Sequence, residues 1–285
     1  MMVWPRWVVG QTTGALIAGM VAAVASASPA AAEPEAGRSI ALGASVIVKP
    51  KYEGSDEHEY IPIPIIIPRM SDVSEDDENQ STFKKYRKRV SFRGLDDIRI
   101  RALGGERLQF GAVTGYITNR DQNDGDQLRG WGDVEGGLVL GAYTGFSLGA
   151  FQLDAAILDK VTGDESGFEM RFGVETTRQL TERTTIVARL GTTLASEEYM
   201  QTYFGVTASQ AARSRAGVPI YTPDAGIKDV HFALGGTMDL TDRWLLKAGG
   251  RYGRLLGDAA DSPVVEAENQ LSGVLGLAYR FNLPR

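Results

Sequence analysis

The stretch FEMRFGVET, residues 168–176, decides the fold of this chain. Its side chains alternate with a period of two, with Phe168, Met170, Phe172 and Val174 on one face and Glu169, Arg171, Gly173 and Glu175 on the other. A period of two predicts a β-strand. An apolar face backed by ionised residues is typical of a strand between lipid and a polar interior, although a soluble β-sandwich would also alternate.

The same alternation recurs along the chain, and the spacing of the strands favours a barrel. Strands are expected near residues 39–48, 59–67, 84–92, 97–103, 107–117, 134–144, 148–158, 168–178, 184–194, 230–239, 243–252 and 270–281. From the fifth strand on, long and short connections alternate, as in bacterial barrels with long extracellular loops and short periplasmic turns. The sequence therefore predicts an all-β, antiparallel transmembrane β-barrel of about 12 strands, with 10 as the alternative. An even number of strands puts both termini in the periplasm.

The N-terminal third fits this scheme less well. The acidic tract Ser71–Gln80 falls on the side of the short turns. It is either an insertion in a periplasmic turn or a sign that one of the first three strands is misplaced. The basic run Lys84–Arg89 follows it, and contact with anionic lipid headgroups and pairing with the acidic tract are equally consistent with it.

Residues 1–32 have the pattern of a cleaved secretory signal peptide, with Arg6 ahead of an apolar stretch and small residues before Glu33. Residues 33–285 are expected to form one outer-membrane barrel domain. After residue 33 no run of ~18 apolar residues occurs, which excludes a helical membrane protein. The net charge of −6 argues against a nucleic-acid partner, and the absence of cysteine excludes thiol and zinc-thiolate chemistry.

Charged residues of both signs lie on the predicted polar faces of the strands. Facing lipid at the midplane would cost roughly 2–4 kcal/mol for an Arg or Lys, so these side chains are expected to point into the lumen. A salt-bridged filling and a selective pore both fit this mixture. The lumen candidates are Arg99, Arg101, Glu135, Asp154, Glu169, Arg171, Glu175, Arg189, Lys247, Arg251 and Arg280.

Motifs that would indicate catalysis or metal binding are weak. The match to G-x-S-x-G at residues 145–149 falls between two expected strands, where a hairpin turn explains it better than a nucleophile elbow does. The loop 120–126 lacks the ligands that a calcium loop needs at its fifth and twelfth positions. Only His58 and His231 are present. We expect no catalytic residue, no cofactor and no metal site.

Aromatic residues are placed as in a membrane barrel. Trp244 and Tyr252 share one face of a single expected strand and would mark the two interfacial girdles. The last strand presents Leu275, Leu277, Tyr279 and Phe281 on one face. Tyr279 and Phe281 are the candidate signal for the barrel-assembly machinery, with four residues following Phe281.

Several longer motifs resemble the MipA/OmpV family of outer-membrane proteins, also called MltA-interacting proteins. They extend over most of the chain after residue 50: YEGSD with IPIPI at 52–56 and 61–65, YM with YFGVTASQAA at 199–212, RLLGDAADSPVV at 254–265 and GLAYRF at 276–281. The resemblance implies an outer-membrane barrel, and for the founding members a scaffold between a murein lytic transglycosylase and a peptidoglycan synthase. Other members are described as porin-like. The tract Ser71–Gln80 resembles an insertion into a turn that is short in relatives.

The family motifs fall in three long connections that the topology places on one side. The connection 195–229 is long enough to be functional or folded over something, and Thr207 or Ser209 would cap a short helix in it. We expect it to pack across the barrel mouth with the other two. The candidate loop residues are Tyr52, Glu53, Gly54, Ser55, Asp56, Tyr203, Phe204, Gly205, Asp258, Asp261, Ser262 and Pro263.

Two functions fit the sequence. The first is a non-catalytic scaffold that holds the two cell-wall enzymes at the outer membrane, although the expected turns 145–147, 179–183 and 240–242 are small for docking two enzymes. The second is a narrow channel for small solutes, which is favoured by the charged lumen. A third function, an outer-membrane hydrolase, would need a catalytic serine or carboxylate pair with a basic partner, and the sequence supplies none at a convincing spacing.

Overall fold

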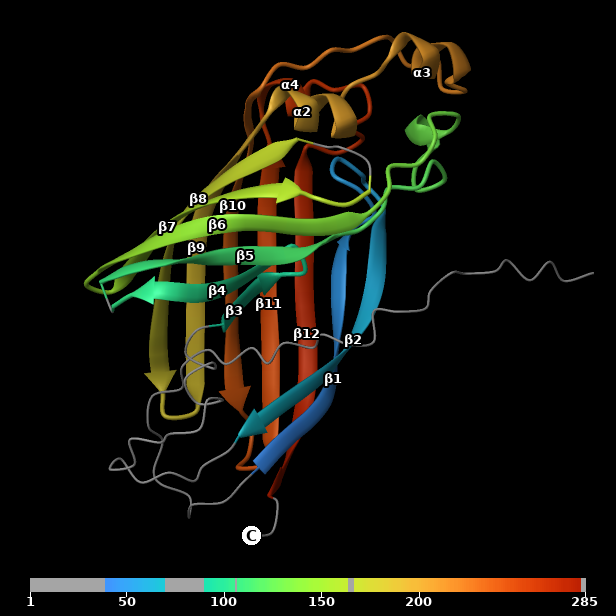
Figure 1. Ribbon diagram of the computed structural model, residues 1–285. Coiled ribbons are helices and arrows are strands. Elements are labelled where there is room, and N and C mark those ends of the chain that lie inside the picture. The colour runs from blue at the N-terminus through green and yellow to red at the C-terminus, as the bar shows by residue number, and fades with distance from the viewer. Residues whose placement is uncertain (1–38, 70–89, 106, 164–166, 283–285) are drawn as a thin grey trace, which may run out of the picture.

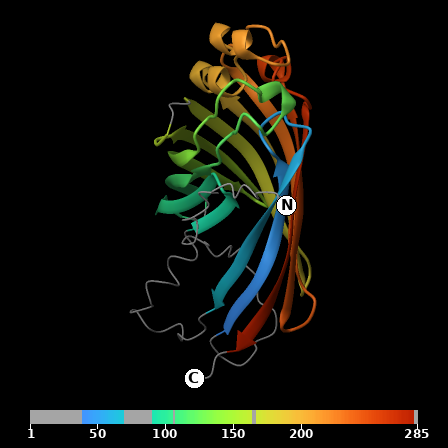
Figure 2. The ribbon, with the colours of Figure 1, turned by 90° about the vertical axis from the view of Figure 1, so that its right-hand side faces the viewer.

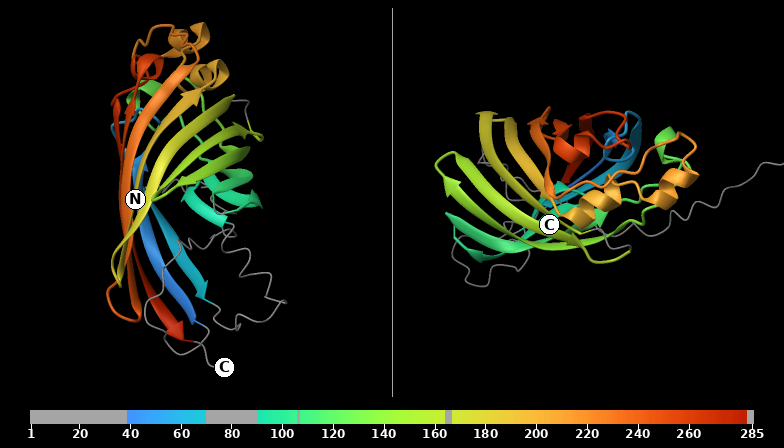
Figure 3. Two further views of the ribbon diagram at one scale, coloured as in Figure 1. Left: turned by 90° about the vertical axis from the view of Figure 1, so that its left-hand side faces the viewer. Right: turned by 90° about the horizontal axis from the view of Figure 1, so that it is seen from above.

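The computed structural model describes residues 39–69, 90–105, 107–163 and 167–282. The expected signal peptide, the acidic tract Ser71–Gln80 and the basic run Lys84–Arg89 lie outside these residues. Within them, twelve strands form a single antiparallel sheet in the order β2-β1-β12-β11-β10-β9-β8-β7-β6-β5-β4-β3. The sheet curls on itself like a barrel, with β2 and β3 as its two margins (Figures 1 and 3).

The strands follow the alternating segments of the sequence closely. They are β1 Ser39–Pro50, β2 His58–Arg69, β3 Val90–Gly94, β4 Asp97–Gly104, β5 Leu108–Ile117, β6 Gly137–Leu148, β7 Phe151–Lys160, β8 Phe168–Thr181, β9 Thr184–Ala195, β10 Gly226–Asp239, β11 Trp244–Leu255 and β12 Asn269–Asn282. The predicted fold class, with twelve strands rather than ten, is confirmed. Neighbouring strands pair along continuous registers, as in Leu140↔Asp159 and Phe172↔Thr192.

Several predicted boundaries were wrong. The first part of the strand expected at 84–92 lies outside the described residues, and its described part, β3, runs from Val90 to Gly94. The turn expected at 145–147 lies at 149–150, because Gly149, with φ of +58°, supplies the left-handed backbone that reverses the chain. Residues 145–148 therefore continue β6, and Ser147 lies within a strand. The strand expected at 134–144 begins later, at Gly137.

The convex and concave faces of the sheet differ as a membrane barrel requires. Large apolar side chains are exposed on the outer face, including Leu140, Phe146, Leu153, Phe232 and Leu277, which are 41–52% exposed. Their strand neighbours point inward and are buried, as Val139 and Ala278 are. An exposed apolar band of this kind is the surface that hydrocarbon covers.

Short turns and long connections lie at opposite ends of the sheet. The turns 149–150, 182–183 and 240–243 lie at one end, and the long connections 118–136, 196–225 and 256–268 lie at the other, with the two-residue turn 95–96 as the exception (Figure 1). Both the start of β1 and the end of β12 lie at the short-turn end. This is the predicted pattern of long and short connections.

The long connections contain the helices. They are η1 Asp126–Leu128, α2 Glu197–Tyr203, α3 Ala208–Arg213 and α4 Gly257–Ala260. Thr207 caps α3 in a capping box with Gln210, so the first of the two predicted cap residues is the correct one. Among the described residues no helix is long and apolar enough to cross a bilayer.

Candidate functional site at the barrel mouth

Four connections fold together at one end of the sheet, and we call them the cap: residues 51–57, 118–136, 196–225 and 256–268 (Figure 1). The three segments that carry the family motifs all belong to it. The Tyr52 hydroxyl donates to Val264 O at 3.2 Å, and the Ser262 hydroxyl donates to Phe204 O at 2.6 Å. The structure therefore brings the three motif segments into direct contact.

The cap has an apolar core of its own. Two clusters of buried side chains fill it, one of Val134, Ala195, Tyr199, Met200, Tyr203, Phe204, Leu255 and Ala259, and one of Tyr52, Leu128, Trp131, Val206, Val218 and Val264. Phe204, Leu128, Met200, Val206 and Val264 are at most 1% exposed. A third cluster, of Val113, Val139, Tyr143, Ala156 and Leu158, lies on the inner face of β5, β6 and β7, so the molecule has buried apolar side chains both in its connections and between its strands.

Individual positions in the cap explain the residues of the motifs. Gly54 has φ of +97°, and a Cβ there would lie 2.6 Å from the side chain of Val265, so only glycine fits. Its carbonyl accepts from Glu266 N and Ala267 N, which ties the first connection to the last. Asp258 accepts from the Tyr221 hydroxyl and from Asp224 N, at 2.9 and 2.7 Å.

Other candidate residues of the motifs are placed less tightly. Asp56 and Asp261 are exposed, Pro263 is half-buried, and Ser55 is buried. Gly205 follows α2, where its N–H donates to Met200 O and a Cβ would collide with Gln201. A carboxylate oxygen of Glu266 lies 3.0 Å from the Tyr52 hydroxyl and is a second acceptor for its single proton. Burial, and then the charge of Glu266, raises the pKa of Tyr52 well above its ordinary value.

The cap reaches across the mouth because α2 contacts connections that leave the sheet at well-separated strands. Arg120, in the connection between β5 and β6, donates to Tyr203 O at 2.8 Å. The Tyr199 hydroxyl donates to Glu53, which lies between β1 and β2, at 3.0 Å. Burial is the main reason that the pKa of Arg120 is lowered and that of Tyr199 is raised.

Lys228 joins the cap to the inner face of the sheet. We call the group formed by Lys228, Glu53, Glu169 and Tyr199 the latch. The Lys228 ammonium donates to Glu53 at 2.6 Å, to Glu169, and to the Tyr199 hydroxyl at 3.2 Å. It also lies 4.6 Å from the centre of the Tyr199 ring. Lys228 and Glu169 have side chains that are each only 3% exposed, so the latch is a buried ion pair at the base of the cap.

Lys228 was not among the predicted lumen residues, because its strand was expected to begin at residue 230. β10 begins at Gly226, with an irregularity between Ile227 and Asp229 that displaces the alternation at this point. Arg171, a predicted lumen residue, extends the latch. Its guanidinium group lies 2.6 Å from the carboxylate of Glu169 and 2.6 Å from that of Asp96. Asp96 lies on a two-residue turn, and no pattern in the sequence indicates its contact with Arg171.

A second charged group lies on the concave face, centred on the carboxylate of Asp154 in β7. Guanidinium nitrogens of Arg93, Arg99 and Arg189 lie 2.9, 2.8 and 2.6 Å from its oxygens. These residues come from β3, β4 and β9, so the contacts cross the interior of the curled sheet. Asp97, 2.8 Å from Arg99, and Glu175, 3.4 Å from Arg93, complete the group. Arg93 and Asp97 were not among the predicted lumen residues.

The remaining lumen candidates lie in different parts of the sheet. Arg251 lies 3.5 Å from Asp229, which is also 2.9 Å from the ring of His231. Arg280 pairs with Asp239 at 3.0 Å near the short turns. Arg101 and Lys247 are half-buried within β4 and β11.

Glu135 was wrong as a lumen candidate. It precedes β6, in the connection 118–136, and its side chain is exposed. The predicted strand began at residue 134, three residues before the ladder between β5 and β6 begins at Ile117↔Gly137. Its carbonyl accepts from the buried Lys160 at 2.8 Å.

The sequence model of the family described as MltA-interacting protein MipA matches residues 42–281. That range includes the whole cap, ten complete strands and all but the outer ends of β1 and β12. The chain belongs to the MipA family. No curated protein sequence matches this MipA-family chain.

Several solved outer-membrane proteins are similar to this MipA-family barrel at low identity. The COG4313 outer membrane channel from Pseudomonas putida F1 is 12% identical, with 88% of this chain and 97% of that chain covered and a TM-score of 0.35. OprB of Pseudomonas putida is 10% identical, with 86% and 94% covered and a TM-score of 0.37. A loop L8 deletion mutant of Vibrio cholerae OmpT is 9% identical, with 87% and 100% covered and a TM-score of 0.35. Likenesses at this level carry no argument about function.

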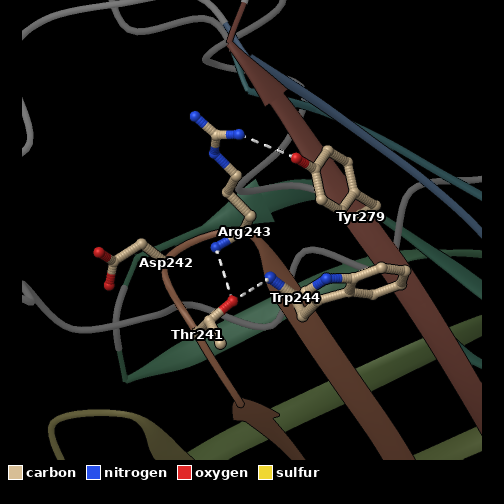
Figure 4. Close-up of a pocket in the computed structure, with 5 residues that line it drawn as sticks. All are labelled: Thr241, Asp242, Arg243, Trp244 and Tyr279. Carbon is tan, nitrogen blue, oxygen red and sulfur yellow. Dashed lines mark hydrogen bonds between the residues drawn. The ribbon is translucent and has the colours of Figure 1, made fainter.

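The MipA-family barrel has an aromatic group at its short-turn end (Figure 4). Trp244 and Tyr279 meet edge to face with ring centres 5.0 Å apart, and Tyr279 and Phe281 lie 4.7 Å apart. Arg243 donates to the Tyr279 hydroxyl at 3.0 Å, beside a hollow of about 380 Å³. Tyr252, eight residues along β11, donates to Asn269 toward the cap. Rings at both ends of one strand are placed as interfacial girdles are.

The motifs that suggested catalysis or metal binding have structural roles. Ser147 lies in β6, where its N–H bonds to Arg107 O, and no helix follows it as a nucleophile elbow requires. Asp121 and Asp124 accept backbone N–H groups of their own loop, at 2.7–2.8 Å. Among the described residues no group of three or more His, Asp or Glu side chains is arranged to hold a metal ion.

Proposed function

We propose that this MipA-family protein is a non-catalytic outer-membrane barrel that anchors cell-wall enzymes, a murein lytic transglycosylase and a peptidoglycan synthase, at the periplasmic side of the membrane. The family description, which names an interaction with MltA, supports the first of these partners. The observation that carries the proposal is the folded cap. A mouth that is bridged by packed connections favours an anchor over an open pore.

The packing of the cap supports this view. Solute passage would require α2 to separate from the connections that it touches, and this would expose Met200 and Phe204, which are 1% and 0% exposed. Fully burying one such side chain is worth about 1.5–3 kcal/mol. It would also break the contacts between Lys228 and Glu53. The closed arrangement is therefore the stable one.

An anchor would present its docking surface at the opposite end. The turns there expose Arg183 and Asp242, which pair at 3.1 Å with side chains 57% and 92% exposed. Arg243 lies beside them, next to the aromatic group. Standard protein interfaces bury about 800 Å² of each partner. This small, charged surface therefore suits a contact in which the partner also touches the membrane, rather than a large protein interface.

Site-specific photo-crosslinking in living cells tests the proposal. A photoreactive amino acid at Asp242 should capture a periplasmic transglycosylase or synthase, identified by mass spectrometry. The matched control is Ile220, 61% exposed on the cap at the other end of the barrel. Recovery of these enzymes from neither position, or equally from both, would contradict a periplasmic docking surface.

A narrow channel is the second candidate, and the charged concave face favours it. Carboxylates and guanidinium groups from β3, β4, β7, β8 and β9 face one another there. A channel would need the cap to open, so conductance should appear in brief events and increase when the latch is broken by Lys228→Met. Planar-bilayer recordings that stay silent for both proteins would exclude the channel.

A further inference from the structure

The hollow at the short-turn end lies where the turn 240–243 leads into β11. It is lined by Thr241, Asp242, Arg243, Trp244 and Tyr279, and its volume is about 380 Å³ (Figure 4). Pockets that bind small molecules have volumes of about 300–1,000 Å³. The hollow is therefore large enough to receive a polar group of the size of a lipid headgroup.

Hydrogen bonds on both sides hold the backbone of Arg243 in place. The Thr241 hydroxyl accepts from Arg243 N at 3.2 Å and from Trp244 N at 3.0 Å. The carbonyl of Arg243 accepts from Arg280 N, in β12, at 2.7 Å. A group that is already held in place loses less conformational freedom when it binds a ligand. Arg243 is thus prepared for binding by the turn on which it lies.

The charge of Arg243 has no carboxylate partner among the described residues, whereas Arg183, on the adjacent turn, pairs with Asp242 at 3.1 Å. The carboxylate of Asp242 points away from Arg243 (Figure 4). The guanidinium group of Arg243 donates one hydrogen bond, to the Tyr279 hydroxyl at 3.0 Å. A guanidinium group has five N–H donors, so further donors remain for an anion. The hollow therefore carries a positive charge that an anion would match.

The two rings of the hollow lie on the outer face of the sheet. Trp244 and Tyr279 are opposite each other in the ladder between β11 and β12, at the short-turn ends of both strands (Figure 2). Leu277 and Leu275 follow on the same face and are 41% and 62% exposed. Tryptophan and tyrosine rings in such positions lie at the level of the lipid headgroups. The hollow thus lies where headgroups meet acyl chains.

The charge and the position of the hollow together select the ligand. A phosphate diester carries a negative charge, and a guanidinium group binds phosphate oxygens through two parallel hydrogen bonds. The acyl chains attached to it would continue over Leu277 and Leu275, which a free anion would leave uncovered. An uncharged sugar would leave the charge of Arg243 unmatched.

We propose that this hollow is a phospholipid site, in which Arg243 binds the phosphate of a glycerophospholipid between the rings of Trp244 and Tyr279. In bacterial barrels the short turns face the periplasm, so the lipid belongs to the periplasmic leaflet. The site goes beyond the proposed anchoring of cell-wall enzymes and does not depend on it.

Native mass spectrometry of the purified protein in detergent micelles tests the proposal, because it separates bound species by mass. The protein is titrated with phosphatidylglycerol, with a diacylglycerol of the same acyl chains, and with inorganic phosphate. Arg243→Gln removes the charge of the hollow and leaves both rings. The matched control is Arg178→Gln, which removes an exposed cation of β8 near the turn 182–183. Arg178 lies three strands from β11, about 14 Å, which exceeds the Debye length of about 8 Å at physiological salt.

We expect the wild-type protein to bind one phosphatidylglycerol molecule more tightly than it binds diacylglycerol or phosphate. Loss of one charge-assisted hydrogen bond weakens binding about ten-fold or more. The affinity of Arg243→Gln for phosphatidylglycerol should fall by that factor, and that of Arg178→Gln should stay within about two-fold of wild type. Heat-modifiable mobility on gels establishes that each variant is folded.

Four results would overturn the proposal. Equal affinities of the wild type and Arg243→Gln would mean that Arg243 does not bind the phosphate, and equal losses in Arg243→Gln and Arg178→Gln would mean general attraction of charge. Diacylglycerol bound as tightly as phosphatidylglycerol would mean that only the acyl chains are held. Inorganic phosphate bound as tightly would mean an anion site rather than a lipid site. None of these results bears on the anchoring of cell-wall enzymes, which the crosslinking experiment tests separately.

Discussion

Removing the charge of Lys228 should release the cap from the barrel. In Lys228→Met the carboxylate of Glu169, 3% exposed, loses its ammonium partner and keeps only Arg171. Breaking a buried ion pair by removing one partner costs about 3–5 kcal/mol, and the remaining arginine places this case near the lower figure. The contact with Glu53, 41% exposed, adds little. A loss of about 3 kcal/mol raises the population of opened cap roughly 150-fold.

Limited proteolysis by thermolysin measures that population, since this protease cleaves beside large apolar residues. Phe204 and Val206 are buried in the closed cap, so cleavage there requires opening. When opening and closing are fast, the cleavage rate follows the equilibrium population of the open form. Cleavage in the connection 196–225 should accelerate by about two orders of magnitude in Lys228→Met.

The matched control is Arg254→Met, which removes a cation from an exposed pair with Glu268, with side chains 49% and 45% exposed. Such a pair contributes about 0–1 kcal/mol, so cleavage should change by less than about five-fold. Adding Glu169→Gln to Lys228→Met removes the buried carboxylate that has lost its ammonium partner, while Arg171 keeps Asp96, and should restore most of the protection. Equal cleavage in Lys228→Met and Arg254→Met, or no recovery in the double variant, would refute the electrostatic role of the latch.

Three further changes test other parts of the structure. Phe204→Ala should destabilise the cap by about 3–5 kcal/mol, against about 0.5 kcal/mol or less for the exposed Ile220→Ala, as measured by the same proteolysis. Asp154→Asn leaves Arg93, Arg99 and Arg189 without their shared carboxylate, and the unfolding temperature in detergent should fall well below that of Asp242→Asn, since breaking a buried pair costs about 3 kcal/mol or more. Burial raises the pKa of Glu266, so its contribution to cap stability is fully present below the ordinary value and is lost as the pH rises through the raised one. Proteolysis of the wild-type cap should therefore quicken from pH 4 to pH 7 more than in Glu266→Gln, and equal pH profiles would contradict this.

Prediction from sequence succeeded where a residue's role depends on its immediate neighbours along the chain. The alternation around Phe168–Thr176 predicted β8 with its correct faces, and the outward set Leu275, Leu277 and Phe281 is exposed as expected. Boundaries failed where the alternation passes smoothly into a turn, as at Glu135, or is displaced, as near Lys228. At such points only the partner strand decides where the ladder stops.

The first two strands differ from the others in their sequence pattern. Residues 40–48 and 61–67 are apolar at nearly every position rather than alternating. Continuous apolar strands indicate apolar surroundings on both faces. That pattern predicts the inward-facing apolar side chains of β1 and β2, such as Ile47 and Ile63, where a uniformly polar lumen was expected.

The sequence by itself determined the strands, their number, their outward faces and the end at which the long connections lie. These features follow from the period-two alternation of the side chains and from the number of residues between the strands. The tertiary structure alone decided which charges pair and that the connections have a core. Arg93 and Asp154, or Tyr52 and Val264, are far apart along the chain and meet only in the folded sheet. Their contact energies depend on burial and distance, and these are properties of the folded molecule that no local pattern encodes.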